Sequence, residues 1–240
     1  MLHEKGVRIN FTLEFSARQN ALVTLVARPD YLNVFLGRIG AFLADNRLGD
    51  GSGAGENAVL SSQEWVTRLS GETGFRTRQI AASLRNYTQL ELLAGTDVYT
   101  MPPKVAAAGR KSLSGLFGSR LTTRYDVPLT EEAAGLGIEK FWEVPKSVVD
   151  LGRQLGRQLP SSGDVIVRLA HEAGLADMFP VMSDADMKRI AAEGKIPVLA
   201  SWRERLLTGE LAPDTMLTLA GLASFTVDQQ QLDDRVRGLI

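Results

Sequence analysis

Residues 67–93 read TRLSGETGFRTRQIAASLRNYTQLELL, and this stretch decides the predicted fold class of the chain. Ser61 predicts the N-cap of a helix over residues 62–72, because a glutamate stands three residues after it, as in a capping box. Gly74 ends that helix, since glycine adopts the left-handed backbone that closes many helices. A second helical pattern predicts another helix over residues 76–93. The sequence therefore predicts two helices on either side of a short glycine turn.

Two helices joined by a three- or four-residue turn with a glycine have the geometry of a helix-turn-helix. The family's usual order is a small residue, a glycine four positions later, an aliphatic residue six positions after that and a second aliphatic residue four further on. The stretch resembles this order at Ser70, Gly74, Ile80 and Leu84. Ser70 departs mildly from it, because alanine is more usual there.

The segment after the second predicted helix extends the resemblance. Residues 96–103, TDVYTMPP, have the composition of a short strand. This order resembles a winged helix-turn-helix, in which a strand or hairpin follows the recognition helix and touches the DNA backbone. The resemblance covers residues 31–103 and implies binding to duplex DNA, with RNA as an alternative nucleic acid.

A recognition helix over residues 76–93 would turn Ile80 and Leu84 inward and expose one polar face. Arginine and glutamine suit contacts to guanine and adenine edges, and serine and threonine suit contacts to phosphates. The competing interpretation is an ordinary solvated helix face. The residues expected to contact nucleic acid are Arg76, Thr77, Arg78, Gln79, Ser83 and Arg85.

The charge distribution supports the same hypothesis. The whole chain has a formal net charge of −1, yet residues 76–124 hold eight basic and two acidic residues. Such a basic segment in a near-neutral chain is typical of a phosphate-binding surface. The alternatives are a mobile linker, or a solvated loop that pairs with the acidic residues of 125–240. The further nucleic-acid-binding residues predicted here are Lys104, Arg110, Lys111, Arg120 and Arg124.

The N-terminal residues contain strand and helix patterns. Residues 7–15 alternate apolar and polar side chains, which predicts a half-buried strand. Residues 21–27 suit a paired strand or a helix capped by Ser16, and the sequence does not decide between them. Apolar residues at helical spacing predict a helix over 32–43. The glycine run at 49–55 is interpreted as a phosphate cradle or as a flexible loop.

The second half of the chain is expected to be helical and to bind protein. In LGRQLGRQL, residues 151–159, leucines recur every four positions and form one helical stripe. Gly152 and Gly156 lie beside this stripe and predict a close approach of two helices. Leucine-rich stripes that short helices cannot bury on their own favour a protein partner or self-association through residues 126–240.

Composition excludes several classes of enzyme. The 240 residues contain no cysteine and two histidines, His3 and His171. We therefore expect no thiol nucleophile, no metal site, no cofactor and no catalytic residue. The longest uncharged apolar stretch is much shorter than the roughly 20 residues of a membrane span, and the charged N-terminus does not resemble a signal peptide. A cytoplasmic location without membrane contact is expected.

The sequence thus predicts a mainly α fold: a small N-terminal β element, a winged helix-turn-helix module and a C-terminal helical bundle. Residues 1–103 form the N-terminal module, 104–125 a basic linker and 126–240 a helical interaction domain. The expected function is non-enzymatic DNA binding for transcriptional control, or for replication or partition of a genetic element. The alternative is a structural subunit of a multiprotein nucleic-acid-processing complex, such as one for RNA-guided DNA targeting. An enzyme is a third possibility for which the sequence shows no site.

Overall fold

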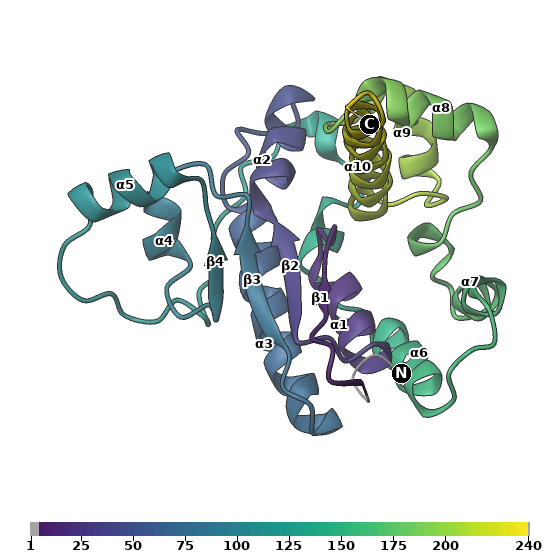
Figure 1. Cartoon of the computed structure of the whole chain (residues 1–240), viewed down its shortest axis with the longest axis horizontal. Coiled ribbons are helices and arrows are strands. Elements are labelled where there is room, and N and C mark those ends of the chain that lie inside the picture. The colour runs from purple at the N-terminus through teal and green to yellow at the C-terminus, as the bar shows by residue number, and fades with distance from the viewer. Residues whose placement is uncertain (1–4, 240) are drawn as a thin grey trace.

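The computed structural model describes residues 5–239 and contains a four-stranded parallel sheet in the order β1-β2-β3-β4 (Figure 1). Helices connect the strands. β2 pairs with β3 over five residues on each strand, and β1 and β4 each pair with one neighbour only. The strands are β1 (Asn10–Phe11), β2 (Tyr31–Phe35), β3 (Arg78–Ala82) and β4 (Val98–Thr100).

Ten α-helices and three 3₁₀ helices are described between residues 5 and 239. The first five α-helices are α1 (Ala17–Val26), α2 (Leu36–Asp45), α3 (Ala54–Thr73), α4 (Thr88–Leu92) and α5 (Pro103–Ser112). The other five are α6 (Lys146–Arg157), α7 (Gly163–Glu172), α8 (Asp184–Glu193), α9 (Leu199–Leu207) and α10 (Pro213–Arg237). The 3₁₀ helices are η2 (Glu131–Ala133), η3 (Ile138–Phe141) and η4 (Ala176–Met178).

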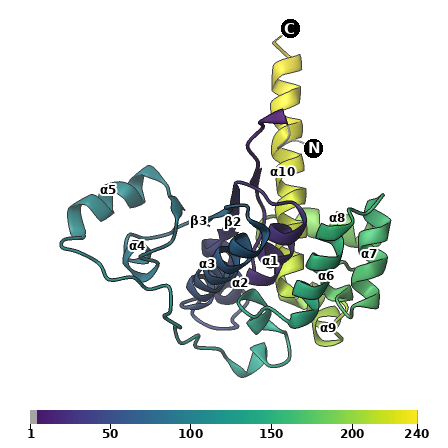
Figure 2. The same ribbon diagram turned by 90° about the horizontal axis from the view of Figure 1, so that it is seen from below.

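The strand order places the connecting helices on one face of the sheet. Connections between parallel strands are right-handed, so strands added in a single direction carry their helices on the same side. Leu32, Val34 and Ala81 point to that side and are fully buried, and α1 and α3 lie there (Figures 1 and 2). The opposite face carries Asn10 and Thr100 and stays partly exposed.

This α/β architecture contradicts the predicted mainly α fold with a winged helix-turn-helix. Residues 78–82 form a central strand, where the sequence predicted the middle of a recognition helix. Ile80 and Leu84 have helical spacing, but a short strand that is buried on both faces cannot be distinguished from a helix by periodicity. Pairing with β2 and β4 decides the outcome. Gly74 ends α3 with φ of 69°, which confirms the predicted turn there.

The predicted wing is likewise a parallel strand of the sheet, β4. Residues 31–35 of the helix predicted over 32–43 form β2, and the helix begins only at Leu36. The helix predicted over 62–72 begins earlier, at Ala54, and Ser61 lies inside it, where its hydroxyl donates to the carbonyl of Trp142.

The first strand is shorter than its alternating pattern predicts. Leu13 has φ of 76°, which interrupts the extended backbone after β1. The alternative left open for residues 21–27 is settled in favour of a helix, because Ser16 caps α1 by accepting from the backbone N–H of Gln19.

The glycine run at 49–55 is a closely packed turn. Gly51 and Gly53 both have positive φ, and a Cβ atom on either would overlap a backbone carbonyl, of Gly40 and Asp126 respectively. The segment is therefore packed against neighbouring backbone, and the flexible-loop interpretation does not describe it.

Helix α6 of the second half packs onto helix α1. Gly152 and Gly156 of α6 face Leu25 of α1, and a Cβ on Gly156 would lie 2.5 Å from the Leu25 carbonyl oxygen. Leu151 and Leu155 are buried between these helices, whereas Leu159 is half-exposed. The predicted close helix approach is confirmed. The proposed division at residues 103 and 126 stays a prediction.

A buried ion cluster joins α1 to the C-terminal helices. The guanidinium of Arg18 donates to both carboxylate oxygens of Asp214, at 2.8 and 2.7 Å, and to Asp177 at 2.9 Å. Lys140 lies 3.0 Å from Asp177. Burial alone would raise the pKa of Asp177, but the charges of Arg18 and Lys140 together lower it.

No helix within residues 5–239 has the length and apolar character required to cross a bilayer.

The α1–α6 contact gives a stability prediction. We expect Gly156→Ala to lower the free energy of unfolding by about 1–2 kcal/mol, because the new methyl group overlaps backbone that cannot rotate away. Gly71→Ala in α3 is the matched control, since nothing lies within 4 Å of its Cβ position. Alanine should stabilise that helix by roughly 0.5–1 kcal/mol. Urea unfolding of both variants measures the difference, and equal stability would contradict the packing described here.

Candidate anion-binding site

Two loops meet at the carboxyl ends of β2 and β3. Strand β2 ends at Phe35 and α2 starts directly after it, while β3 ends at Ala82 and continues into Ser83, which has φ of 66°. The carboxyl ends of parallel strands are where α/β proteins place their ligands, because loops and helix N-termini converge there.

Gly37 brings these two loops together. A Cβ atom at Gly37 would overlap the carbonyl oxygen of Ser83 and lie 2.6 Å from Nε of Arg85. Only glycine leaves room for the Arg85 side chain to cross the start of α2. An arginine from β3 is therefore held against the first turn of a helix from β2.

Arg38 is the second cation at this place. Its side chain is 7% exposed, and its Nη1 has no hydrogen-bond partner among the described residues. The guanidinium carbon lies 5.4 Å from the ring centroid of Phe35 and 5.9 Å from that of Phe225. Burial, and next the charge of Arg85, lower the pKa of Arg38, while Asp228 acts in the opposite direction.

A buried donor without an acceptor next to a second cation is an unfavourable arrangement that an anion would relieve. The N-terminus of α2 also favours an anion, because no side chain caps the first-turn N–H groups of this ten-residue helix. Backbone N–H groups at a helix start together with arginines favour phosphate, which accepts several charge-assisted hydrogen bonds. The geometry therefore suits a phosphate group.

Polar amides lie on the partly exposed face of the sheet beside these loops. Asn33 of β2 donates to the side-chain oxygen of Asn10 at 2.8 Å and to the carbonyl of Phe11 at 2.8 Å. Asn10 is itself exposed. Such amides both donate and accept, so they suit the hydroxyl groups of a polar ligand.

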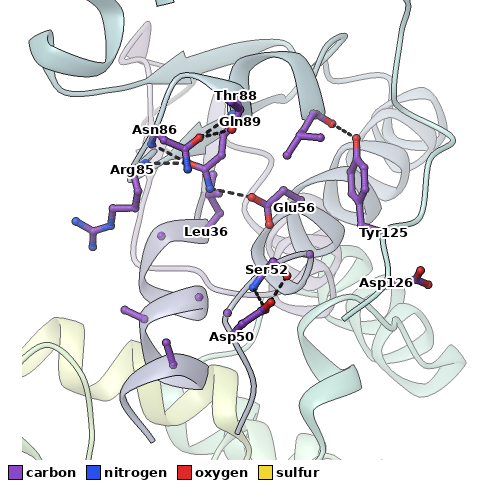
Figure 3. A pocket seen from close by; sticks show the side chains of 17 residues that line it. Leu36, Asp50, Ser52, Glu56, Arg85, Asn86, Thr88, Gln89, Tyr125 and Asp126 are labelled. Atoms are coloured by element: carbon purple, nitrogen blue, oxygen red, sulfur yellow. Dashed lines mark hydrogen bonds between the residues drawn. The ribbon is translucent and has the colours of Figure 1, made fainter. Parts of the chain in front are cut away.

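A cleft of about 600 Å³ adjoins Arg85 on the side of α4 (Figure 3). Its lining includes three carboxylates, those of Asp50, Glu56 and Asp126, which would repel a phosphate. Gln89 donates to Glu56 at 2.8 Å and accepts from the backbone N–H of Arg85 at 2.7 Å. Gln89 thus fixes the backbone of Arg85. The guanidinium of Arg85 points away from Glu56 (Figure 3).

Glu14 is a buried carboxyl group at the same end of β1. Its Oε2 accepts from the backbone N–H of Asn33 at 3.4 Å, and its Oε1 has no partner among the described residues. Burial raises the pKa of Glu14 to about 8, although hydrogen bonds from the backbone act in the opposite direction. The group therefore favours its protonated form at neutral pH.

This raised pKa predicts how stability depends on pH. The folded state holds the Glu14 proton more tightly than the unfolded state, so the contribution is complete below about pH 4.5 and is lost as pH rises towards 8. One pKa unit corresponds to about 1.4 kcal/mol, so the loss amounts to a few kcal/mol. We expect Glu14→Gln to remove this decrease between pH 5 and 8, measured by denaturant unfolding. An unchanged pH profile would show that Glu14 is ionised in the folded protein.

The structure separates the residues that the sequence assigned to one recognition helix. Arg76 is exposed in the loop after α3, and Thr77 is buried with its hydroxyl donating to the Pro29 carbonyl. Arg78 lies on β3 over the ring of Tyr31, and Gln79 is fully buried against the helices. Ser83 and Arg85 follow β3, so of this group only these two belong to the candidate site.

The basic residues predicted between 104 and 124 do not form a single surface with Ser83 and Arg85. Lys104, Arg110 and Lys111 lie on α5. Arg120 lies 3.7 Å from Glu91, and Arg124 forms an ion pair with Glu64 at 2.6 Å. The last two charges therefore pair with acids of the first half of the chain, whereas the competing interpretation assigned them partners in the second half.

Arg38 was not predicted from the sequence as a site residue. Its signal is that Arg38 and Arg85 each stand three residues after the end of a buried strand, at Phe35 and Ala82. With both strands interpreted as parts of helices, this shared spacing was not visible.

Comparison with known proteins identifies relatives of the first part of the chain. The family model that matches residues 1–139 is described as Transaldolase/Fructose-6-phosphate aldolase. A transaldolase of Nostoc punctiforme is 27% identical over 141 residues, 59% of this chain and 40% of that protein. Transaldolases of Prochlorococcus marinus strain MIT 9301 and of its subspecies pastoris are 32% and 30% identical over 108 and 104 residues, in each case 43% of this chain and 31% of the relative. The chain thus spans about a third of the length of these relatives.

These matches correct the functional interpretation. The family is one of sugar-phosphate aldolases with an α/β fold. It contradicts the resemblance to a winged helix-turn-helix and the non-enzymatic DNA-binding function. It also contradicts the alternative, a subunit of a nucleic-acid-processing complex, and the predicted nucleic-acid and protein partners. The expectation that the chain is not an enzyme is contradicted by the same relatives. The basic and polar residues that suggested phosphate binding belong to a different architecture.

Proposed function

This chain belongs to the transaldolase/fructose-6-phosphate aldolase family, and we propose that Arg38 and Arg85 bind the phosphate group of the sugar phosphate substrate of an aldolase-type enzyme. The observation that supports this most strongly is the buried Nη1 of Arg38, which lacks an acceptor beside a second arginine. A phosphate dianion supplies that acceptor and neutralises both cations.

The surroundings of the two arginines fit the rest of such a ligand. No side chain caps the first turn of α2, on which Arg38 stands, so its N–H groups are available to an anion. Asn10 and Asn33 lie along β1 and β2, where they can contact hydroxyl groups of the sugar chain. The site thus combines a strongly cationic end with a neutral polar one, as a phosphorylated sugar requires.

Aldol chemistry needs a further group. Breaking a carbon–carbon bond beside a carbonyl leaves an electron pair, which a lysine imine or a metal ion accepts in known enzymes. None of the four strands described between residues 5 and 239 carries a lysine. We therefore assign to these strands the phosphate-binding part of the site.

The sheet itself is consistent with completion by further strands. Parallel sheets in proteins are normally covered on both faces. Within residues 5–239, β1 and β4 are the edge strands of the sheet, and the face with Asn10 and Thr100 is partly exposed. In the proposal, additional parallel strands along these edges close the sheet into the barrel-like arrangement of the α/β fold and supply the electron acceptor.

Calorimetric titration with fructose 6-phosphate and with fructose tests the phosphate assignment. We expect the chain to bind the phosphorylated sugar and not to bind fructose at the same concentration. Arg38→Gln and Arg85→Gln should each weaken binding about 10- to 100-fold, the range expected for losing one charge-assisted hydrogen bond.

Arg76→Gln is the matched control, because Arg76 is exposed in a loop outside the site and should leave binding unchanged. Equal binding of the two sugars, or equal affinity in all three variants, would contradict the proposed function.

A further inference from the structure

Helix α10 reaches the anion site although it lies outside residues 1–139 that match the family model. It starts in the body of the molecule and its C-terminal half projects from it (Figure 2). Phe225 and Gly221, one helical turn apart, both face Arg38. We propose that α10 positions the Arg38 guanidinium for phosphate through these two residues; this inference rests on the proposed function.

Phe225 supplies an aromatic ring to a cation that strand β2 already contacts. The Arg38 guanidinium carbon lies 5.9 Å from the Phe225 centroid and 5.4 Å from the Phe35 centroid. An aromatic face attracts a guanidinium within about 6 Å, although Phe225 itself is 40% exposed. Two rings from different elements therefore restrict the orientation of one side chain. Phe225 is a positioning residue, since it acts on the ligand through Arg38.

Gly221 leaves space for the nitrogen that has no partner. A Cβ atom at this position would lie 3.3 Å from Nη1 of Arg38 and 2.9 Å from Cδ2 of Leu13. Any side chain at this position must displace one of the two. Glycine thus allows α10 to lie directly against the guanidinium.

The N-terminal part of α10 is packed firmly, so the helix can position the Arg38 side chain. Met216, Leu217 and Ala220 are fully buried in the main core. The hydroxyl of Thr218 donates to the carbonyl of Leu13 at 2.9 Å, which ties the helix to the segment after β1. Gly221 and Phe225 follow directly, so their distance from Arg38 is set by packed residues.

The charges around Arg38 do not supply an acceptor for its Nη1. Arg85 from the β3–α4 loop repels Arg38, and Asp228 on α10 attracts it. Asp228 lies 4.0 Å from Lys195 and is exposed. This carboxylate is therefore shared with a second cation and does not satisfy Nη1, which still lacks an acceptor.

Titration of the whole chain with inorganic phosphate tests the inference. We expect Phe225→Leu and Phe225→Ala to weaken phosphate binding about three- to tenfold, since both remove the ring. Phe225→Tyr keeps a ring and should bind within twofold of the unmodified chain. Leu232→Ala is the control, because Leu232 is an exposed apolar residue of α10 two turns further on. It should leave the affinity unchanged.

Gly221→Ala gives an independent test. Alanine favours helix formation, so a weaker affinity cannot be assigned to loss of helix. We expect at least a threefold loss as the methyl group displaces Arg38 or Leu13. Thermal unfolding of each variant accompanies the titrations.

The outcomes separate this inference from the function on which it rests. If the unmodified chain does not bind phosphate, the proposed function fails and the inference fails with it. If the unmodified chain binds phosphate and both Phe225→Leu and Gly221→Ala bind it equally well, α10 has no positioning role and the proposed function stands. Lower melting temperatures with unchanged phosphate affinity would also overturn the inference, because they would indicate a purely structural role.

Discussion

The buried ion pair between Arg18 and Asp214 is the interaction on which the arrangement of the site depends. The guanidinium binds both carboxylate oxygens, and the Ser16 hydroxyl donates to the same carboxylate at 2.6 Å. Both charged side chains are almost completely buried. Removing one partner of such a pair typically costs about 3–5 kcal/mol, because the other charge is left without compensation. The start of α10 is thereby held to the start of α1.

That constraint is transmitted along α10 to the anion site. Asp214 stands in the first turn of the helix, Thr218 one turn later and Gly221 and Phe225 after that. Because an α-helix rises 1.5 Å per residue, Phe225 lies about 16 Å along the axis from Asp214. A rigid helix anchored at one end can therefore set the position of a side chain at the other. The ion cluster stabilises the fold, and through α10 it also determines what surrounds Arg38.

The sequence predicted much of the helical structure and misjudged the sheet, for a physical reason. The glycine turn at Gly74 and the small residues at Gly152 and Gly156 act through backbone geometry that glycine alone permits, so their patterns were sufficient, whereas the cap at Ser16 remained one of two alternatives. Strand β3 depends on pairing with β2, which lies more than 40 residues away in the chain. Its five residues, RQIAA, show no alternation of apolar and polar side chains and suit a helix equally well. Long-range pairing overrode a local pattern that favoured the helix.

The candidate site, like the sheet, depends on residues that are distant in the chain, and the sequence alone did not bring them together. The excess of arginine near residue 80 was interpreted as a nucleic-acid surface, although nucleic acids and sugar phosphates present the same anionic group. What distinguishes them is the arrangement of the cations. A nucleic-acid surface needs several cations along an exposed face, whereas one phosphate group needs two that converge. Arg85 lies near enough to lower the pKa of Arg38 because β2 and β3 are adjacent and Gly37 lets their loops touch, so the proposed phosphate site depends on the sheet.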